Sequence, residues 1–182
     1  MKTRKKKSEG SDSKTLSSHS DYLQLYRACI SNSFSLIEEA RLLYKHKYYA
    51  RAFFLALTAD EELGKSQLIA DFINDCFSQE EFEKAFRDHD LKIAYNRRYL
   101  TLSEGTKGDA TIEYDLKDVK SYIKARMNSL YVNRTGTSPL LPSEVINKDM
   151  AKRMIESVIE DLGNIEYSEW LNQRIGTKGL AK

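Results

Sequence analysis

Residues 48–77 read YYARAFFLALTADEELGKSQLIADFINDCF, and this stretch decides the fold. Its apolar residues recur at spacings of three and four and cover more than one side of a helix. Such a broad apolar arc is typical of a helix that packs against several neighbours. Residues 60–65, DEELGK, form the densest polar group and separate two strongly apolar halves. We expect residues 48–77 to form the central helix of the domain.

Helical periodicity also marks the stretches on either side of this helix. A capping box, Ser78-Gln-Glu-Glu81, begins a helix that we expect to continue through Leu100, and Asn147 caps the last helix. Two glycines predict a loop at 103–109, and two prolines predict an extended connection near 131–142. With the central helix, the predicted helices number about five; the other four cover residues 21–45, 78–100, 115–130 and 148–172.

The composition agrees with a single all-α domain. The chain has 182 residues, of which 31% are charged and 41% hydrophobic, with only two Pro and eight Gly, which disfavours collagen-like and turn-dense all-β classes. Cys29 and Cys76 lack CxxC spacing, so we expect no zinc site or disulfide framework and a cytoplasmic location. No run of eighteen apolar residues and no Gly-rich phosphate loop occurs, so we expect no membrane association and no cofactor.

The net charge of +2 is distributed unevenly along the chain. Residues 1–20 contain six Lys or Arg, two Asp or Glu and six Ser, so they carry +4 and the remaining residues carry −2. Such a segment cannot bury enough apolar surface to offset its ordering entropy. We expect a disordered basic tail at 1–20, a helical domain at 21–175 and a frayed C-terminus at 176–182. Any contact with RNA would need a local groove or the tail.

The polar group in the central helix is the first candidate site. Glu61 and Glu62 lie four and three residues before Lys65, so either carboxylate can reach this ammonium along the helix surface. Leu57 and Leu68 share the stripe with Glu61 and Lys65, and charges on an apolar face are costly unless they are paired. We therefore favour a functional site over an exposed ion pair on the helix surface.

A second candidate site lies on the following helix. His89 comes after Phe86 on the apolar face, which would bring its imidazole toward the central helix, and Arg87 and Lys92 accompany it. Histidine is the side chain best suited to moving a proton near neutral pH. The alternative is a core histidine with satisfied hydrogen bonds.

Four segments, in the same order, resemble the abortive-infection proteins of the AbiV type, a branch of the HEPN superfamily. Each matches one motif of that family: A…A-x-E-E-x-G-K, F-x-x-H-x-x-K, K/R…L-Y-V-D and P…I-T. The segments are residues 49–65 (YARAFFLALTADEELGK), 86–92 (FRDHDLK), 126–133 (RMNSLYVN) and 142–146 (PSEVI). The resemblance spans about residues 25–165, with Asn133 in place of the usual Asp.

The resemblance implies an all-α HEPN helical bundle, often a homodimer, that serves in bacterial defence against phage. Many HEPN proteins are metal-independent ribonucleases that use an R-x(4–6)-H motif. The only literal match in this chain is Arg41 to His46, outside the motif segments, where surface charge is an equally good interpretation. Arg126 and Tyr131 lie in the third motif segment and are candidate binding residues.

Metal-independent RNA cleavage needs a base, an acid and a cation for the phosphate. His89 is the candidate base or acid, and positive charge would come from Arg87, Lys92 or Lys65. Glu61 and Glu62 would orient these cations and hold the histidine tautomer; we expect no metal.

Two functions stay open at this point. The first is a toxin that cuts RNA at a cleft between two copies of the chain. The second is a non-catalytic effector that binds a phage-encoded or host protein to arrest translation, with the same charged residues as a buried network. A helical adaptor without a defence role is a third and less specific interpretation.

Overall fold

A computed structural model of the chain describes residues 19–76, 78–96, 98–102, 110–114 and 116–170. Within these residues the chain forms seven helices and two short antiparallel hairpins, so the predicted all-α class is confirmed. In chain order the elements are α1 (His19–Lys45), α2 (Tyr49–Ile73), α3 (Gln79–Arg87), α4 (His89–Asn96), β1 (Arg98–Leu102), β2 (Ala110–Tyr114), α5 (Leu116–Leu130), β3 (Asn133–Thr135), β4 (Ser138–Leu140), α6 (Pro142–Val145) and α7 (Lys148–Trp170).

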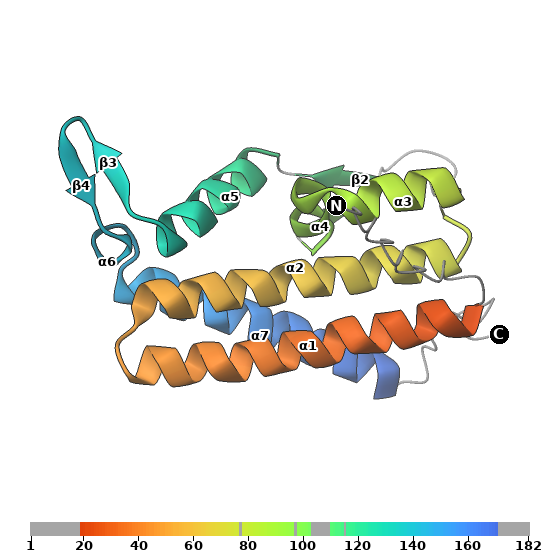
Figure 1. Cartoon of the computed structure of the whole chain (residues 1–182). Helices are drawn as coiled ribbons and strands as arrows, with labels where there is room; N and C mark the ends of the chain where they lie inside the picture. Colours follow the sequence, from red (N-terminus) through yellow and green to blue (C-terminus); the bar gives the residue numbers. More distant parts are fainter. Residues whose placement is uncertain (1–18, 77, 97, 103–109, 115, 171–182) are drawn as a thin grey trace, which may run out of the picture.

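Helix α2 is the centre of the bundle, as its apolar pattern predicts. It contacts every other helix; α1 and α7 pack along one side of it, and α3, α4 and α5 lie along the other (Figure 1). Phe53, Leu57 and Leu63 are buried in one large core with Met154 and Val158 of α7. A helix with neighbours on so many sides needs apolar residues all round, which explains its broad apolar arc.

Helices α1 and α2 both end in a left-handed residue that is not glycine. Lys47 has φ 65°; its N–H donates to the Tyr44 carbonyl at 2.9 Å, and the Tyr48 N–H donates to the Leu43 carbonyl at 2.9 Å. Asp75 has φ 62° and closes α2 with the same pair of hydrogen bonds. These are Schellman motifs, in which glycine is the usual left-handed residue.

The third predicted helix is divided into two. The capping box is confirmed, since the Glu81 N–H donates to Ser78 Oγ and the Ser78 N–H donates to the Glu81 carboxylate at 2.9 Å. Asp88, however, is extended (φ −86°, ψ 115°), and its carboxylate accepts from the Leu91 N–H at 3.2 Å. The prediction of one helix through Leu100 is wrong, because Asp88 ends α3 and caps α4.

The sequence predicts neither of the two hairpins. Strands β1 and β2 pair in antiparallel register; β1 lies where the sequence predicts the end of a helix, and no element is predicted for the residues of β2. The predicted loop at 103–109 falls outside the described residues. The extended connection near 131–142 is confirmed and contains the β3–β4 hairpin, which turns at Gly136 with φ 62°. Helix α6 then begins at Pro142, a position that suits proline because no N–H is needed there.

The ends of the chain are described only in part. Helix α1 begins at His19, two residues before the predicted start, and the rest of the predicted tail lies outside the described residues. The predicted frayed end, 176–182, also lies outside them. Among the described helices, none is both long and apolar enough to cross a membrane.

Candidate functional site

One buried carboxylate holds three basic side chains where α2, α4 and α5 meet. Glu61 Oε1 lies 2.7 Å from His89 Nδ1 and 3.3 Å from Lys92 Nζ, both on α4. Glu61 Oε2 lies 3.1 Å from Arg126 Nη1 on α5, and the Arg126 guanidinium also lies over the Phe54 ring. We call Glu61, His89, Lys92 and Arg126 the Glu61 cluster.

The four side chains of the cluster differ in their exposure to solvent. Glu61 and Lys92 are almost fully buried, with 4% and 5% of the side chain exposed, whereas Arg126 is 25% exposed and His89 is 62% exposed. Unpaired charges at such depth would be strongly unfavourable. The ion pair between Glu61 and Lys92 therefore anchors α4 to α2, while His89 and Arg126 present the cluster to solvent.

Electrostatics fix the tautomer of His89. Burial alone would raise the pKa of Glu61, but the hydrogen bond from His89 and the charges of Arg126, His89 and Lys92 together lower this pKa below its ordinary value. Glu61 is thus ionised at neutral pH, and a carboxylate can only accept hydrogen bonds. His89 Nδ1 must carry the hydrogen, and Nε2 of this mostly exposed ring is the atom that can accept a proton.

Gly64 allows α4 to approach α2 at the cluster. A Cβ atom on Gly64 would lie 1.7 Å from the carbonyl oxygen of Lys92, so the backbone of α4 rests directly on this glycine. Gly64 lies one helical turn after Glu61, which places Lys92 and His89 within reach of the carboxylate. Gly64 is not among the predicted site residues, although a glycine in a helix interior costs about 1 kcal/mol relative to alanine, which is a signal that could have identified it.

Asn96 anchors the C-terminal end of α4 by hydrogen bonds. Its Nδ2 atom donates to Asp60 Oδ1 at 2.6 Å and to Asp161 Oδ2 at 3.0 Å, and its Oδ1 accepts from Gln67 Nε2 at 2.8 Å. These bonds tie α4 to α2 and α7. No local pattern in the sequence predicts this network, because its members, Asp60, Gln67, Asn96 and Asp161, show no common spacing.

The remaining residues of the DEELGK group form a separate pair. Among the described contacts, Lys65 forms an ion pair with Glu62 and none with Glu61, so only one of the two carboxylates that the spacing places within reach of Lys65 pairs with it. Glu61 faces α4 and α5, whereas Glu62 faces Cys29 of α1. Burial, and to a lesser extent the Glu62 charge and hydrogen bond, outweigh the opposing charge of Lys65 and raise the pKa of Cys29 to about 12.

The other predicted site residues lie outside the cluster. Arg87 is exposed and bonds only with Glu83, one turn earlier on α3, among the described contacts. Arg41 is exposed and pairs with Glu38 on α1, and His46 lies exposed in the turn after α1. Tyr131 is exposed just after α5. The structure thus brings together Glu61, His89, Lys92 and Arg126 but not the other predicted residues.

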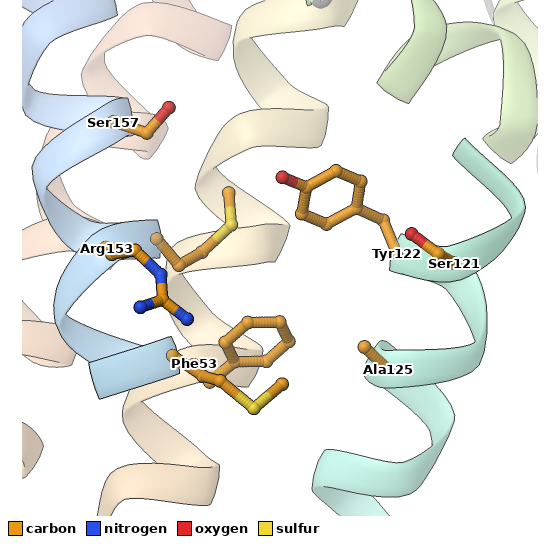
Figure 2. A pocket seen from close by; sticks show the side chains of 8 residues that line it. Phe53, Ser121, Tyr122, Ala125, Arg153 and Ser157 are labelled. Carbon is orange, nitrogen blue, oxygen red and sulfur yellow. The ribbon is translucent and has the colours of Figure 1, made fainter. Parts of the chain in front are cut away.

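A cavity of about 510 Å³ lies between α5 and α7, over α2. Figure 2 shows Phe53 at its base, with the Arg153 guanidinium beside that ring and the Tyr122 hydroxyl directed into the space. Met150 and Met154 also line this cavity. In the described part of the chain, no group of three or more His, Cys, Asp or Glu side chains is arranged to hold a metal ion.

Comparison with known proteins identifies the family. The family model for AbiV of the HEPN group matches residues 21–160, which is well over half of the chain and includes the whole Glu61 cluster. No curated protein and no solved structure matched the chain. The extent of the family match agrees with the motif segments and with the all-α fold, and the chain belongs to the AbiV family of HEPN proteins.

Proposed function

We propose that this protein is an abortive-infection effector that acts against phage by cutting RNA at the Glu61 cluster. Membership of the AbiV family associates the chain with abortive infection and defence. The observation that carries the ribonuclease proposal is the 2.7 Å contact between Glu61 and His89, which joins a buried carboxylate to a mostly exposed imidazole. This pairing is the usual arrangement of a histidine that transfers protons.

In the proposed reaction, His89 Nε2 takes the proton from a ribose 2′-hydroxyl. The 2′-oxygen then forms a bond to phosphorus, and the bond from phosphorus to the 5′-oxygen breaks, which leaves a 2′,3′-cyclic phosphate. Arg126, which is partly exposed, supplies positive charge to the phosphate. Glu61 stabilises the imidazolium that forms, and Lys92 keeps Glu61 ionised at its buried position.

The departing 5′-oxygen needs a proton from a second group. We propose that the effector is a homodimer, in which the protonated His89 of a second copy would supply this proton. One histidine would then act as base and the other as acid, as metal-independent cleavage requires.

The test is to incubate the purified full chain with tRNA and total RNA in the presence of EDTA. His89→Ala should reduce cleavage by about 10²–10⁴-fold, the usual contribution of a general acid or base. The matched control is His19→Ala, which removes an exposed histidine at the start of α1 and should leave cleavage unchanged. The products should carry 2′,3′-cyclic phosphate ends.

Two results would refute this function. If His89→Ala cuts RNA as fast as the unaltered chain, His89 is not the proton-transfer group. If neither protein cuts RNA while both still arrest growth, the chain is not a ribonuclease.

The cavity between α5 and α7 favours a second candidate function, a non-catalytic effector that binds a phage or host protein. Its lining combines Phe53, Met150 and Met154 with one cation, Arg153. Methionine-rich apolar grooves suit the binding of an amphipathic helix. In this case the protein would arrest cell-free translation without RNA cleavage, and replacement of the partly buried Met150 by Lys (Met150→Lys), rather than His89→Ala, would abolish the arrest.

A further inference from the structure

The turn between α1 and α2 faces the segment from Leu141 to Ile146, which contains α6, at one end of the bundle (Figure 1), and a small hollow lies between them. The hollow has a volume of about 280 Å³. Lys47, Tyr48 and Arg51 line it on one side, and Leu141 and Pro142 line it on the other. We call this region, residues 45–51 with residues 131–146, the turn surface.

The turn surface combines exposed aromatic rings with positive charge. Tyr48 is 61% exposed and Tyr131 is 54% exposed. Residues 45–51 and 131–146 contain four Lys or Arg and one acidic residue, Glu144, although the domain outside the N-terminal segment is slightly acidic. Within the described part of the chain, Lys45, Lys47 and Arg134 form no ion pair. The positive charge of this surface is therefore available to an anionic partner.

Lys47 places its cation at the hollow. Lys47 occupies a left-handed position where glycine is preferred, and a residue with a Cβ atom is strained there. The lysine side chain lines the hollow beside Tyr48.

We infer that the turn surface binds single-stranded RNA, with one base stacked on Tyr48 in the hollow and phosphates on Lys47 and Arg51. Exposed aromatic rings that stack bases, beside cations that follow the backbone, are the general means of binding single strands. An excess of four cations over one carboxylate, Glu144, favours a polyanion over a protein of mixed charge.

This inference rests on the proposed function, because it gives the ribonuclease a second contact with its substrate. Arg51 lies ten residues before Glu61 on α2, which corresponds to about 15 Å along the helix. A short strand of RNA can span this separation. The turn surface would then hold RNA while the Glu61 cluster acts on it.

The test measures binding of a labelled single-stranded RNA of mixed sequence by fluorescence anisotropy, at several salt concentrations. Tyr48→Ala should weaken binding by about 5- to 100-fold, as expected for loss of one stacked base. Arg51→Gln should weaken binding and reduce its salt dependence. The matched control is Arg27→Gln, which removes an exposed cation near the other end of α1, and it should bind less than 2-fold more weakly, within about 0.4 kcal/mol.

Lys47→Gly separates a binding role from a structural one. Relief of the backbone strain should raise Tm by about 2–4 °C, while loss of the cation weakens RNA binding. Asp75→Gly is the matched control, because Asp75 occupies the same left-handed position at the end of α2. It should raise Tm similarly without weakening RNA binding.

Failure of this inference is distinguishable from failure of the proposed function. If the RNA fails to bind, or if Tyr48→Ala and Lys47→Gly bind it like the unaltered chain, the turn surface is not an RNA site. Preference for a duplex over the single strand would also overturn it. If these variants lose binding but the unaltered chain never cuts RNA, the turn surface stands and the ribonuclease proposal falls.

Discussion

Replacing Gly64 by alanine tests whether the contact between α2 and α4 builds the Glu61 cluster. The new Cβ atom would lie 1.7 Å from the Lys92 carbonyl oxygen, whereas ordinary contacts begin near 3.4 Å. The obstruction is backbone, which cannot rotate away as a side chain can. Helix α4 must therefore move by about 1.7 Å, the difference between these two distances. A shift of this size would lengthen the 2.7 Å contact between His89 and Glu61 beyond hydrogen-bond range.

The energetic effect should be opposite to the usual one. Alanine in place of a helix-interior glycine normally stabilises a protein by about 0.5–1 kcal/mol. At Gly64 the steric conflict should instead destabilise the fold by about 1–3 kcal/mol, as overpacking generally does. For a chain of this length, that corresponds to a decrease in Tm of about 2–12 °C. Gly163 of α7 provides the matched control, because a Cβ atom there would meet nothing within 4 Å.

The assay is thermal and urea denaturation of Gly64→Ala and Gly163→Ala, together with NMR of the histidine ring nitrogens. Gly163→Ala should be slightly more stable than the unaltered chain and keep the hydrogen-bonded Nδ1–H signal of His89. Gly64→Ala should lose both stability and this signal. If Gly64→Ala is as stable as Gly163→Ala and keeps the signal, the close approach of α4 does not position the cluster.

Other side chains give further expected outcomes. Glu61→Gln leaves buried positive charge without its carboxylate and should cost about 3–5 kcal/mol in urea denaturation at pH 7. Because the folded-state pKa of Glu61 is lowered, its contribution to stability is present above the ordinary glutamate pKa of about 4.3 and is lost as the pH falls through the folded-state value. Below about pH 4.3, the free energy of unfolding should therefore fall less steeply with decreasing pH in Glu61→Gln than in the unaltered chain. Urea denaturation at a series of acidic pH values would measure this difference. Cys29 is buried and its pKa is raised to about 12, so it should resist iodoacetamide at pH 8, whereas the exposed Cys76 should react. Mass spectrometry should therefore find one modified thiol, and equal labelling of both cysteines would contradict the burial of Cys29. Asn96→Ala removes a hydrogen-bond donor from the buried Asp60 and should lower the free energy of unfolding by about 1–3 kcal/mol. An unchanged midpoint in urea denaturation would show that the Asn96 network adds no stability.

Much of the fold follows from local patterns in the sequence. The broad apolar arc of residues 48–77 predicts the central helix, and the capping box at Ser78 predicts where α3 begins. The break at Asp88 was missed because apolar spacing continues across it, from Phe82 and Phe86 to Ile93. Aspartate is a favoured cap, but the same residue also occurs on exposed helix faces. Spacing alone therefore does not reveal a short interruption.

The sequence predicts most of the residues in the candidate site but not which of them pair with each other. Glu61, His89 and Lys92 were identified from charged residues in apolar stretches, and the structure brings them together. The expected partner of Glu61 was Lys65, because spacing along one helix is visible in the sequence. Arg126 is 65 residues away, and only the packing of α5 on α2 brings it to the carboxylate. Contacts between helices depend on tertiary packing, which no local pattern encodes.

The origin of the Glu61 cluster on three separate helices has a consequence for a cell that makes this protein. Under the proposed function, the reactive arrangement does not exist in any single segment, because α2, α4 and α5 must all dock before His89, Lys92 and Arg126 surround one carboxylate. A chain still emerging from the ribosome before α5 is made would lack the complete set. Toxicity would thus begin only when synthesis and folding of the domain are finished.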